Sequence, residues 1–304
     1  MKSRTYLILS GGLGNQLFQF ASAYSLCKAW KRELALVNYW FTRTPQRGPS
    51  LERFARRSEL YNFPEVSNKT VVASELEQNV VYNVTRLMRR FPALRLDRWH
   101  LDLGHEDPDY RFDRSLLNRP RDVLSGYYQC LEYFSPHCIQ DLRALIRLSD
   151  SAERDLAVIV EGLRRDCGRV VMMHVRRGDV LSPNNGWAGL LSPSYYVYAI
   201  RSLGYSMKNA MVFSDDIDWC SSVAEFSGAF FVREDEPSRG LRLMSYCDDF
   251  VIAGSTFSLW GALLGNDPEK KVIAPAPFFK EHLHSELERF IIPENWIRAP
   301  AQYL

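Results

Sequence analysis

The stretch Tyr6–Asn38, YLILSGGLGNQLFQFASAYSLCKAWKRELALVN, decides the fold. Its apolar run Tyr6–Leu9 predicts a strand, three glycines between residues 11 and 14 break that run, and Leu17–Trp30 repeats apolar residues at helical spacing. Glu33–Asn38 then predicts a second strand. Together these segments make one βαβ unit with a glycine-rich turn after its first strand, which is typical of a parallel sheet.

A second series of strands and helices begins near Ser151. Strands are predicted at Arg169–Val175, Ala210–Phe213, Phe250–Ala253 and Lys271–Ala274, and helices at Ser194–Leu203 and Thr256–Leu264. At 304 residues the chain is long enough for two packed domains. We therefore predict an α/β fold of two Rossmann-like domains, residues 1–150 and 151–304, with ligands at the carboxyl ends of the strands.

The composition excludes several classes of protein. Hydrophobic residues make up 46% and charged residues 24%, as in an ordinary globular chain. The net charge of +2 gives no case for nucleic-acid binding. No stretch approaches the ~20 apolar residues of a membrane span, and the start lacks a signal peptide, so we expect a soluble cytoplasmic protein. The six cysteines form no C-x-x-C pair, which favours free thiols over a zinc or redox site.

The turn Gly11–Gln16, GGLGNQ, follows a predicted strand and opens a predicted helix. Glycines there allow a ligand to approach the backbone, and amides at a helix start favour anions. A dinucleotide site is disfavoured, because Leu17 stands at the third glycine position and the next strand ends in Asn38 instead of an acidic residue. The alternatives are a plain tight turn, or a site where Asn15 and Gln16 bind sugar hydroxyls.

The block His174–Asp179, HVRRGD, ends a strand of apolar residues. Adjacent side chains at a strand end point to opposite sides, so one arginine can reach a ligand while the other holds the loop. The planar guanidinium suits diphosphates, and Gly178 would let the chain turn Asp179 back toward the ligand. The alternatives are a solvated loop with an Arg–Asp pair and, for His174, a core histidine.

Two further polar blocks follow predicted strands. In Ser214–Trp219, SDDIDW, the pair Asp216 and Asp218 could hold Mg²⁺ or Mn²⁺, or a carboxylate could accept hydrogen bonds from a guanine edge. Alternatively, Ser214 and Asp215 could cap a helix that begins near Asp216. In Gly254–Gly261, GSTFSLWG, small hydroxyl residues lead into a helix and could seat a diphosphate, whereas Phe257 and Trp260 favour core packing. The chain contains neither a G-x-S-x-G elbow nor a P-loop motif.

In this order the blocks resemble the bacterial α-1,2-fucosyltransferases of glycosyltransferase family 11. The family's patterns G-G-L-G-N-Q-[LM]-F-Q-[FY]-A, G-Y-[FY]-Q, H-x-R-R-G-D, F-S-D-D and S-T-F-S-x-W-G-A match Gly11–Ala21, Gly126–Gln129, His174–Asp179, Phe213–Asp216 and Ser255–Ala262. The chain departs at Leu259, where the family usually has Trp, and at Cys130–Leu131. We expect these departures to bear on acceptor choice.

The resemblance implies a GT-B-type arrangement, with the two domains facing across a cleft and GDP-fucose held mostly by residues 151–304. It implies inverting transfer of L-fucose from GDP-β-L-fucose to the 2-hydroxyl of a terminal galactose, with no cofactor and no required metal. The catalytic residues it implies are Arg176 as the main diphosphate contact, Asn15 toward fucose and acceptor, and Asp179 as a candidate base. The donor-binding residues it implies are Gly12, Gly14, His174, Arg177, Asp215, Asp216, Ser255, Thr256, Phe257 and Ser258.

The expected partners are GDP-fucose and a galactose-terminated oligosaccharide, such as an O-antigen unit of a bacterial surface polysaccharide, which could be lipid-linked. Acceptor contacts are expected in residues 1–150, at Thr42–Pro64 and Tyr127–Tyr133. The arginines of Arg86–Arg98 could hold the enzyme at the inner face of the membrane. The alternatives are a metal-dependent transferase of another nucleotide sugar, a non-catalytic glycan- or nucleotide-binding protein and, third, an oxidoreductase.

Overall fold

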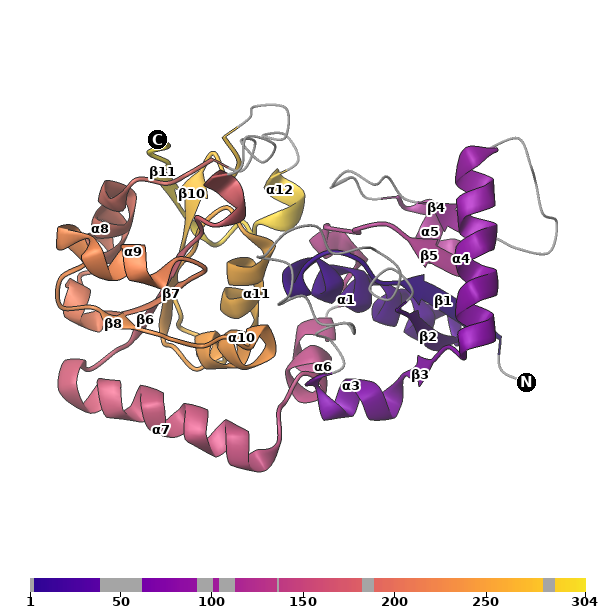
Figure 1. Cartoon of the computed structure of the whole chain (residues 1–304), viewed down its shortest axis with the longest axis horizontal. Helices are drawn as coiled ribbons and strands as arrows, with labels where there is room; N and C mark the ends of the chain where they lie inside the picture. Colours follow the sequence, from indigo (N-terminus) through magenta and orange to yellow (C-terminus); the bar gives the residue numbers. More distant parts are fainter. Residues whose placement is uncertain are drawn as a thin grey trace. The chain divides into compact units, whose positions relative to one another are not determined.

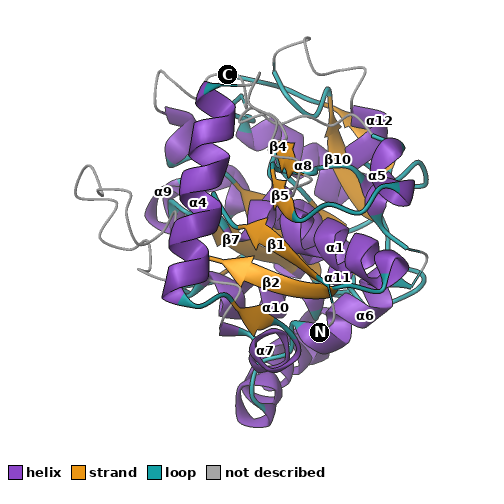
Figure 2. Cartoon of the chain, turned by 90° about the vertical axis from the view of Figure 1, so that its right-hand side faces the viewer, coloured by secondary structure: helices purple, strands orange, loops and turns teal. Residues whose placement is uncertain are grey.

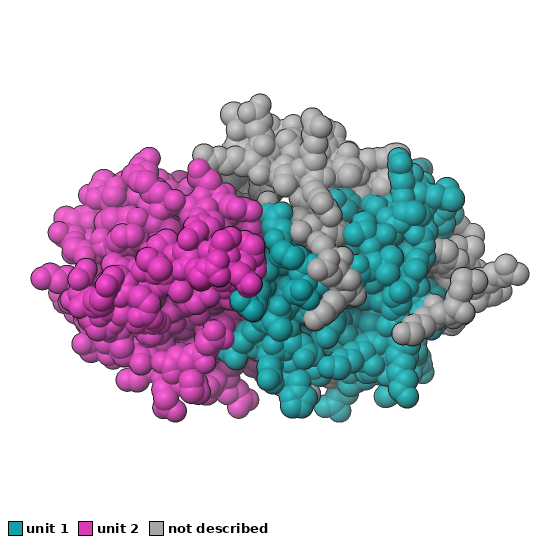
Figure 3. Space-filling model, turned by 90° about the horizontal axis from the view of Figure 1, so that it is seen from below, with its two compact units in different colours: residues 1–147 teal, residues 148–304 magenta. Residues whose placement is uncertain are grey.

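The computed structural model describes residues 3–38, 62–91, 101–103, 113–135, 137–181, 189–280 and 288–304. The chain divides into two compact units, Met1–Arg147 and Leu148–Leu304 (Figure 3). Most of the predicted excursion Thr42–Pro64 lies outside the described residues, and so does the arginine-rich segment after Phe91. Among the described helices, none combines the length and the hydropathy that crossing a membrane requires.

The N-terminal unit contains a five-stranded parallel sheet in the order β3-β2-β1-β5-β4. The strands are β1 (Arg4–Ile8), β2 (Glu33–Val37), β3 (Val71–Val72), β4 (Leu101–Leu103) and β5 (Val123–Ser125). The helices are α1 (Leu13–Trp30), α3 (Pro64–Lys69), α4 (Glu75–Arg90), α5 (Ser115–Asn118) and α6 (Cys138–Leu145), with a 3₁₀ turn η2 (Leu131–Tyr133). Helices α1 and α4 lie on opposite faces of this sheet (Figures 1 and 2).

Helix α1 begins at Leu13, four residues before the predicted start at Leu17. Gly11 adopts a φ of +73°, which turns the chain directly after β1, and Gly12 occupies the N-cap position. The helix is buried along most of its length, so its apolar pattern is continuous and its start could not be located from periodicity.

The C-terminal unit contains a six-stranded parallel sheet in the order β11-β10-β9-β6-β7-β8. The strands are β6 (Val171–Val175), β7 (Ala210–Ser214), β8 (Phe230–Phe231), β9 (Asp249–Val251), β10 (Val272–Ala276) and β11 (Ile297–Pro300). The helices are α7 (Asp150–Cys167), α8 (Pro193–Ser202), α9 (Ile217–Ser222), α10 (Pro237–Ser245), α11 (Thr256–Leu264) and α12 (Glu288–Ile291), with 3₁₀ turns at Asp179–Leu181, Met207–Asn209 and Ala224–Phe226. The predicted α/β class, with two separate parallel sheets, is confirmed.

Both faces of the C-terminal sheet are covered, which explains why its central strands are continuous apolar runs. Every residue of β6 is buried, and alternate residues point to opposite faces. Val171, Met173 and Val175 belong to a core that also includes Tyr195 and Tyr196 of α8. On the other face α10 packs against α7 and α11.

The order of the strands in the C-terminal sheet reverses between β6 and β9. The loops that leave the carboxyl ends of two such strands diverge, which opens a crevice where ligands bind in folds of this kind. The sequence blocks after β6 and β9 therefore stand where ligand-binding residues are expected. In the N-terminal sheet the block after β1 stands at the carboxyl ends of the neighbouring strands β1 and β5.

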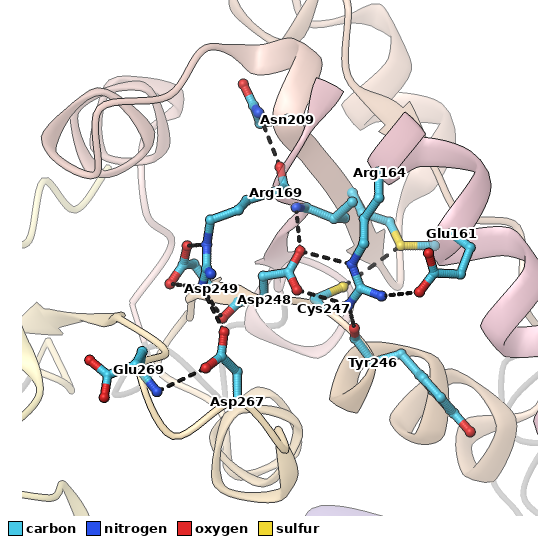
Figure 4. A network of polar contacts seen from close by, with 12 residues as sticks. Glu161, Arg164, Arg169, Asn209, Tyr246, Cys247, Asp248, Asp249, Asp267 and Glu269 are labelled. Carbon is cyan, nitrogen blue, oxygen red and sulfur yellow. Dashed lines mark hydrogen bonds and ion pairs between the residues drawn. The ribbon is translucent and has the colours of Figure 1, made fainter. Parts of the chain in front are cut away.

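Ion pairs gather at the opposite, amino edge of the C-terminal sheet (Figure 4). Arg164 of α7 donates to both oxygens of Asp248, at 3.1 and 2.8 Å, and Arg169 pairs with Asp249 and with Asp267. Asp248 also accepts the backbone N–H of Val170 at 2.8 Å. These contacts hold the starts of β6 and β9 together.

A buried ion pair joins the first turn of α7 to α10. Glu153 and Arg242, 4% and 5% exposed, form a bidentate contact at 3.0 and 2.8 Å. The hydroxyl of Tyr246 and the backbone N–H of Leu148 donate to the same carboxylate. Burial by itself would raise the pKa of Glu153, but the hydrogen bonds from Arg242 and Tyr246 outweigh it, and the net shift is downward.

We expect Arg242→Met to lower the free energy of unfolding by about 3–5 kcal/mol at neutral pH, because it leaves a buried carboxylate without its counter-ion. The pKa of Glu153 is lowered in the wild type, so the wild type loses this stabilisation as the pH falls below the ordinary glutamate value of 4.5. In the variant, protonation of Glu153 removes the buried unpaired charge. The difference in the free energy of unfolding between the two proteins should therefore become smaller on acidification. Urea denaturation between pH 7 and pH 4 measures it.

The matched control is Arg233→Met, which removes the exposed pair between Arg233 and Asp218, 66% and 82% exposed. It should leave the unfolding midpoint nearly unchanged at every pH. Equal destabilisation by the two substitutions would contradict the structural role given to the Glu153–Arg242 pair. A difference in the free energy of unfolding between the wild type and Arg242→Met that grows at low pH would also contradict it.

Candidate functional site

The two arginines after β6 point to different neighbours, as the alternation along a strand predicts. Arg176 donates from Nη1 to the backbone oxygen of Gly254, 2.9 Å away in the turn after β9. Arg177 turns toward the end of β7, where Nε donates to Asp216 Oδ2 at 3.0 Å and its guanidinium carbon lies 3.6 Å from the centre of the Trp219 ring. Arg176 therefore lies on the side of the strand-order reversal, and Arg177 holds the loop.

Asp215 fixes the turn that follows the arginines. Its carboxylate accepts the backbone N–H of Arg177 at 2.8 Å and that of Gly178 at 2.9 Å. A Cβ on Gly178 would lie 2.7 Å from Asp215 Oδ2, so the close approach requires a residue without a side chain. Both oxygens of Asp215 are engaged by this turn, which gives Asp215 a structural role beside the donor contact that the family resemblance implies.

Asp216 is the N-cap of α9, accepting the backbone N–H of Trp219 at 3.2 Å, and it also pairs with Arg177. Asp218 faces away from it and pairs with Arg233 at 2.7 Å. The helix cap was expected at Ser214 or Asp215, and this expectation is wrong, because α9 begins at Ile217 and Asp216 is its N-cap. Ser214 Oγ instead accepts the backbone N–H of Asp216 at 3.0 Å. The described residues include no group of three or more His, Cys, Asp or Glu side chains placed to hold a metal ion.

The turn after β9 leads into α11, whose N-cap is Ser255. Ser255 Oγ accepts the N–H of Phe257 at 3.3 Å, and Thr256 is half-buried at the start of the helix. Ser258 is fully buried and donates its hydroxyl to backbone oxygens, so it stabilises the turn from within. The half-buried Phe257 lies with its ring centre 5.9 Å from that of His174, which is 7% exposed.

The end of β6 and the start of α11 together form a site suited to an anion. The guanidinium of Arg176 is held against the turn that opens α11, and a helix start adds the partial positive charge of its N–H groups. Arginine keeps its charge at all physiological pH values and donates in a planar fork that matches phosphate oxygens. This arrangement can bind a diphosphate.

The N-terminal unit has a second polar cluster, at the carboxyl ends of the neighbouring strands β1 and β5. Asn15, in the first turn of α1, accepts a hydrogen bond at Oδ1 from Gln129 Nε2, 2.8 Å away. Gln129 follows β5 and is 2% exposed. A Cβ on Gly11 would lie 2.9 Å from Asn15 Nδ2 and 3.3 Å from Tyr127. The cluster therefore joins the turn after β1 to the aromatic segment after β5.

The other residues expected around this turn have different environments. Gln16 is buried and donates to the backbone oxygen of Gly11 at 2.7 Å, so its amide stabilises the turn. Gly12 is exposed and a Cβ there would meet no atom within 4 Å, whereas Gly14 is buried inside α1. Asp179 begins a short 3₁₀ turn, and the described part of the structure does not include its side chain.

Two contact residues were not singled out from the sequence. Trp219 stacks on Arg177. Its position three residues after Asp216 is the one feature of the sequence that could have predicted the hydrogen bond from its backbone N–H to the Asp216 carboxylate. Gln129 could have been paired with Asn15 only by knowing that β5 lies beside β1, which is a contact between segments far apart in the chain.

We expect Gly178→Ala to lower the free energy of unfolding by about 1–3 kcal/mol, because the added methyl group displaces the Asp215 carboxylate from two backbone N–H groups. Urea denaturation measures the change. The matched control is Gly162→Ala on α7, where a Cβ meets only the tip of Arg165 at 4.0 Å; this substitution should stabilise by about 0.5–1 kcal/mol. A Gly178→Ala protein as stable as the wild type would contradict the proposed close packing.

Two bacterial proteins are similar to this chain along nearly its whole length. An α-1,2-colitosyltransferase from Escherichia coli is 29% identical, covering 95% of this chain and 97% of its own. The O-antigen biosynthesis glycosyltransferase WbnK from Escherichia coli is 28% identical, covering 96% and 99%. A galactoside α-(1,2)-fucosyltransferase 2 from Rattus norvegicus is 25% identical over 66% of this chain and 62% of its own.

Among solved structures, the fucosyltransferase NodZ from Bradyrhizobium matches with a TM-score of 0.45 at 13% identity, covering 87% of this chain and 93% of its own. The glycosyltransferase of family 9 from Veillonella parvula matches with a TM-score of 0.47 at 11% identity, covering 98% and 86%. The model of glycosyl transferase family 11 matches residues 113–298, more than half of the chain, and that range includes the blocks after β6, β7 and β9. The chain therefore belongs to glycosyltransferase family 11, as its sequence blocks predict.

Proposed function

We propose that this fucosyl-type glycosyltransferase transfers L-fucose from GDP-β-L-fucose to the 2-hydroxyl of a terminal galactose, with inversion and without a metal ion. The observation that supports the proposal most is the hydrogen bond that holds the Arg176 guanidinium against the turn opening α11. Membership of family 11 and similarity to an α-(1,2)-fucosyltransferase support the donor and the linkage. Similarity to an O-antigen biosynthesis glycosyltransferase supports a bacterial surface polysaccharide as acceptor.

The chemistry of the donor explains why a cation is needed at this position. When the bond between the fucosyl carbon and the β-phosphate oxygen breaks, negative charge develops on the phosphate and positive charge on the sugar ring. Arg176, the hydroxyl of Thr256 and the helix-start N–H groups would stabilise the phosphate. A donor preorganised in this way contributes about 3–4 kcal/mol to the transition state. A guanidinium can thus supply the charge that Mg²⁺ supplies elsewhere.

The N-terminal cluster would serve the fucose and the acceptor. Because Gln129 donates to Asn15 Oδ1, the Asn15 amide is held in one orientation, and its Nδ2 group is a donor suited to a sugar hydroxyl. The exposed backbone at Gly12 would allow a sugar to approach closely. Asp179 remains the candidate base for the acceptor hydroxyl.

A second donor is favoured by a specific observation, because one relative is a colitosyltransferase. Colitose lacks the 3-hydroxyl group that fucose has. An enzyme whose site binds that hydroxyl should strongly prefer GDP-fucose. With GDP-colitose the enzyme's hydrogen-bonding group would be left unpaired, which lowers the rate of transfer strongly. We propose GDP-fucose as the donor and make GDP-colitose the comparison.

Turnover of both donors against a panel of terminal β-galactosides, with and without EDTA, tests the proposal. We expect GDP-fucose to react at an unchanged rate in EDTA, and linkage analysis to give an α-1,2 product. A rate abolished by EDTA and restored by Mn²⁺ would replace the proposal with a metal-dependent transferase. Faster turnover of GDP-colitose would correct the donor, and donor binding without any turnover would indicate a non-catalytic binding protein.

We expect Arg176→Ala to lower kcat/KM at least ~100-fold, because it removes a charged donor that acts on the leaving phosphate. Arg201→Ala, which removes an exposed arginine from α8 of the same unit, is the matched control and should retain full activity. Thermal unfolding of both variants separates a catalytic loss from a folding defect. Activity of a folded Arg176→Ala protein within a fewfold of the wild type would refute the role of this guanidinium.

A further inference from the structure

The outward face of α4 carries an unusual set of side chains. Leu76, Val80, Leu87 and Phe91 are 75%, 43%, 45% and 47% exposed. Their spacing of four, seven and four residues places them on one face of the helix. We call these four residues the apolar stripe. Helix α4 covers one face of the N-terminal sheet (Figures 1 and 2). The stripe runs from Leu76 in its first turn to Phe91, its C-cap residue.

The inward face of α4 is held mainly by polar contacts. Only Val81 and Thr85 of the helix are buried, and Val81 joins a small core with Ile8 and Val37. Gln78 donates to the backbone oxygen of Ala73 at 2.8 Å, and its side-chain oxygen accepts the N–H of Asn38. Tyr82, Val84 and Met88 are half-buried beside Val81, so α4 covers only part of its apolar surface and leaves the stripe exposed to solvent.

Further polar contacts fix this orientation at both ends. Glu77 closes a capping box with Ser74 and accepts hydrogen bonds from Arg4 and the Tyr6 hydroxyl; these contacts, the Ser74 N–H first, lower the pKa of Glu77 to about 2. Arg89 donates to Ser125 Oγ at 3.1 Å near the other end. Rotating α4 to bury the stripe would break the bonds to Arg4, Tyr6 and Ser125.

Basic residues accompany the C-terminal half of the stripe. Arg86 and Arg90 are both exposed, and the guanidinium of Arg90 lies 5.5 Å from the ring centre of Phe91. The sequence continues with Arg95 and Arg98, beyond the described residues. The acidic residues of the helix, Glu75 and Glu77, stand in its first turn. Exposed apolar and basic side chains thus coincide around Leu87 and Phe91.

We infer that the apolar stripe, with Arg86 and Arg90, is a docking surface for an anionic lipid bilayer. Apolar side chains backed by arginines are the combination that binds the boundary between lipid headgroups and acyl chains, and each arginine adds attraction to an anionic surface. A second copy of the chain is a weaker candidate, because four partly exposed side chains offer less than the ~800 Å² per partner of a stable dimer. The surface serves reversible attachment and is separate from the transfer chemistry.

Sedimentation of the full chain with vesicles tests this surface. Vesicles of phosphatidylcholine with an equal amount of phosphatidylglycerol should bind the protein, and pure phosphatidylcholine vesicles should bind it far less. We expect Leu87→Gln/Phe91→Gln to weaken binding about 10-fold or more, and Arg86→Gln/Arg90→Gln to weaken it about fivefold per arginine at low salt. High salt screens the attraction between the arginines and the anionic lipid, so it should weaken vesicle binding by the wild type to the level of the arginine variant.

Matched controls keep the test specific. Val158→Gln/Tyr198→Gln removes two exposed apolar side chains, 67% and 51% exposed, from α7 and α8. Arg154→Gln/Arg165→Gln removes two exposed arginines from α7. Both pairs should bind vesicles like the wild type, and thermal unfolding should show that every variant is folded. Three results would each overturn the inference. The first is equal vesicle binding by the stripe variant and the control variants, and the second is no binding of the wild type to anionic vesicles. The third is a dimer of the wild type in light scattering that the stripe variant abolishes.

Discussion

The candidate site in the C-terminal unit depends on the two hydrogen bonds that the Asp215 carboxylate accepts from the backbone of Arg177 and Gly178. An ionised carboxylate binds backbone N–H groups more strongly than a neutral acceptor does, and here it ties the end of β6 to the end of β7. With this turn fixed, the consecutive side chains of Arg176 and Arg177 can point in different directions. Arg177 is held by Asp216 and Trp219, and Arg176 is left to reach across the strand-order reversal to the start of α11.

The two units use different chemistry at corresponding places in their sheets. The C-terminal unit brings charged side chains to its strand-order reversal, which suits a charged diphosphate. The N-terminal unit brings neutral amides, those of Asn15 and Gln129, beside an aromatic segment. Neutral amides and aromatic rings suit sugar hydroxyls and the apolar faces of sugar rings. This contrast fits the proposed transfer from a charged donor to an uncharged acceptor.

The sequence predicted the long elements and the blocks that follow them better than it predicted their partners. Strand β6 and helix α11 are apolar at most positions, so their pattern is plain, and α11 begins at Thr256 as predicted. Strands β3 and β8 are two residues long and carry no periodicity at all. The contact between Asn15 and Gln129 depends on β1 pairing with β5, which local pattern does not encode.

Local chemistry was also insufficient where one residue had several possible roles. Asp215 and Asp216 were candidates for binding the donor, Asp216 also for a metal ion, and Ser214 and Asp215 for the helix cap that Asp216 provides; the choice depends on where Arg177 points, which tertiary packing decides. The orientation of α4 is a similar case, because its arginines are visible in the sequence but the exposure of its apolar residues is not.

The Arg164 and Arg169 ion pairs bear on how this enzyme can change. They lie at the amino edge of the C-terminal sheet, whereas the proposed donor site lies at the carboxyl edge of the same strands. The connections that hold the sheet are thus spatially apart from the groups proposed to bind the donor. Residues around the donor can be exchanged during evolution with little effect on folding, so related transferases that differ in their sugar can arise on one scaffold.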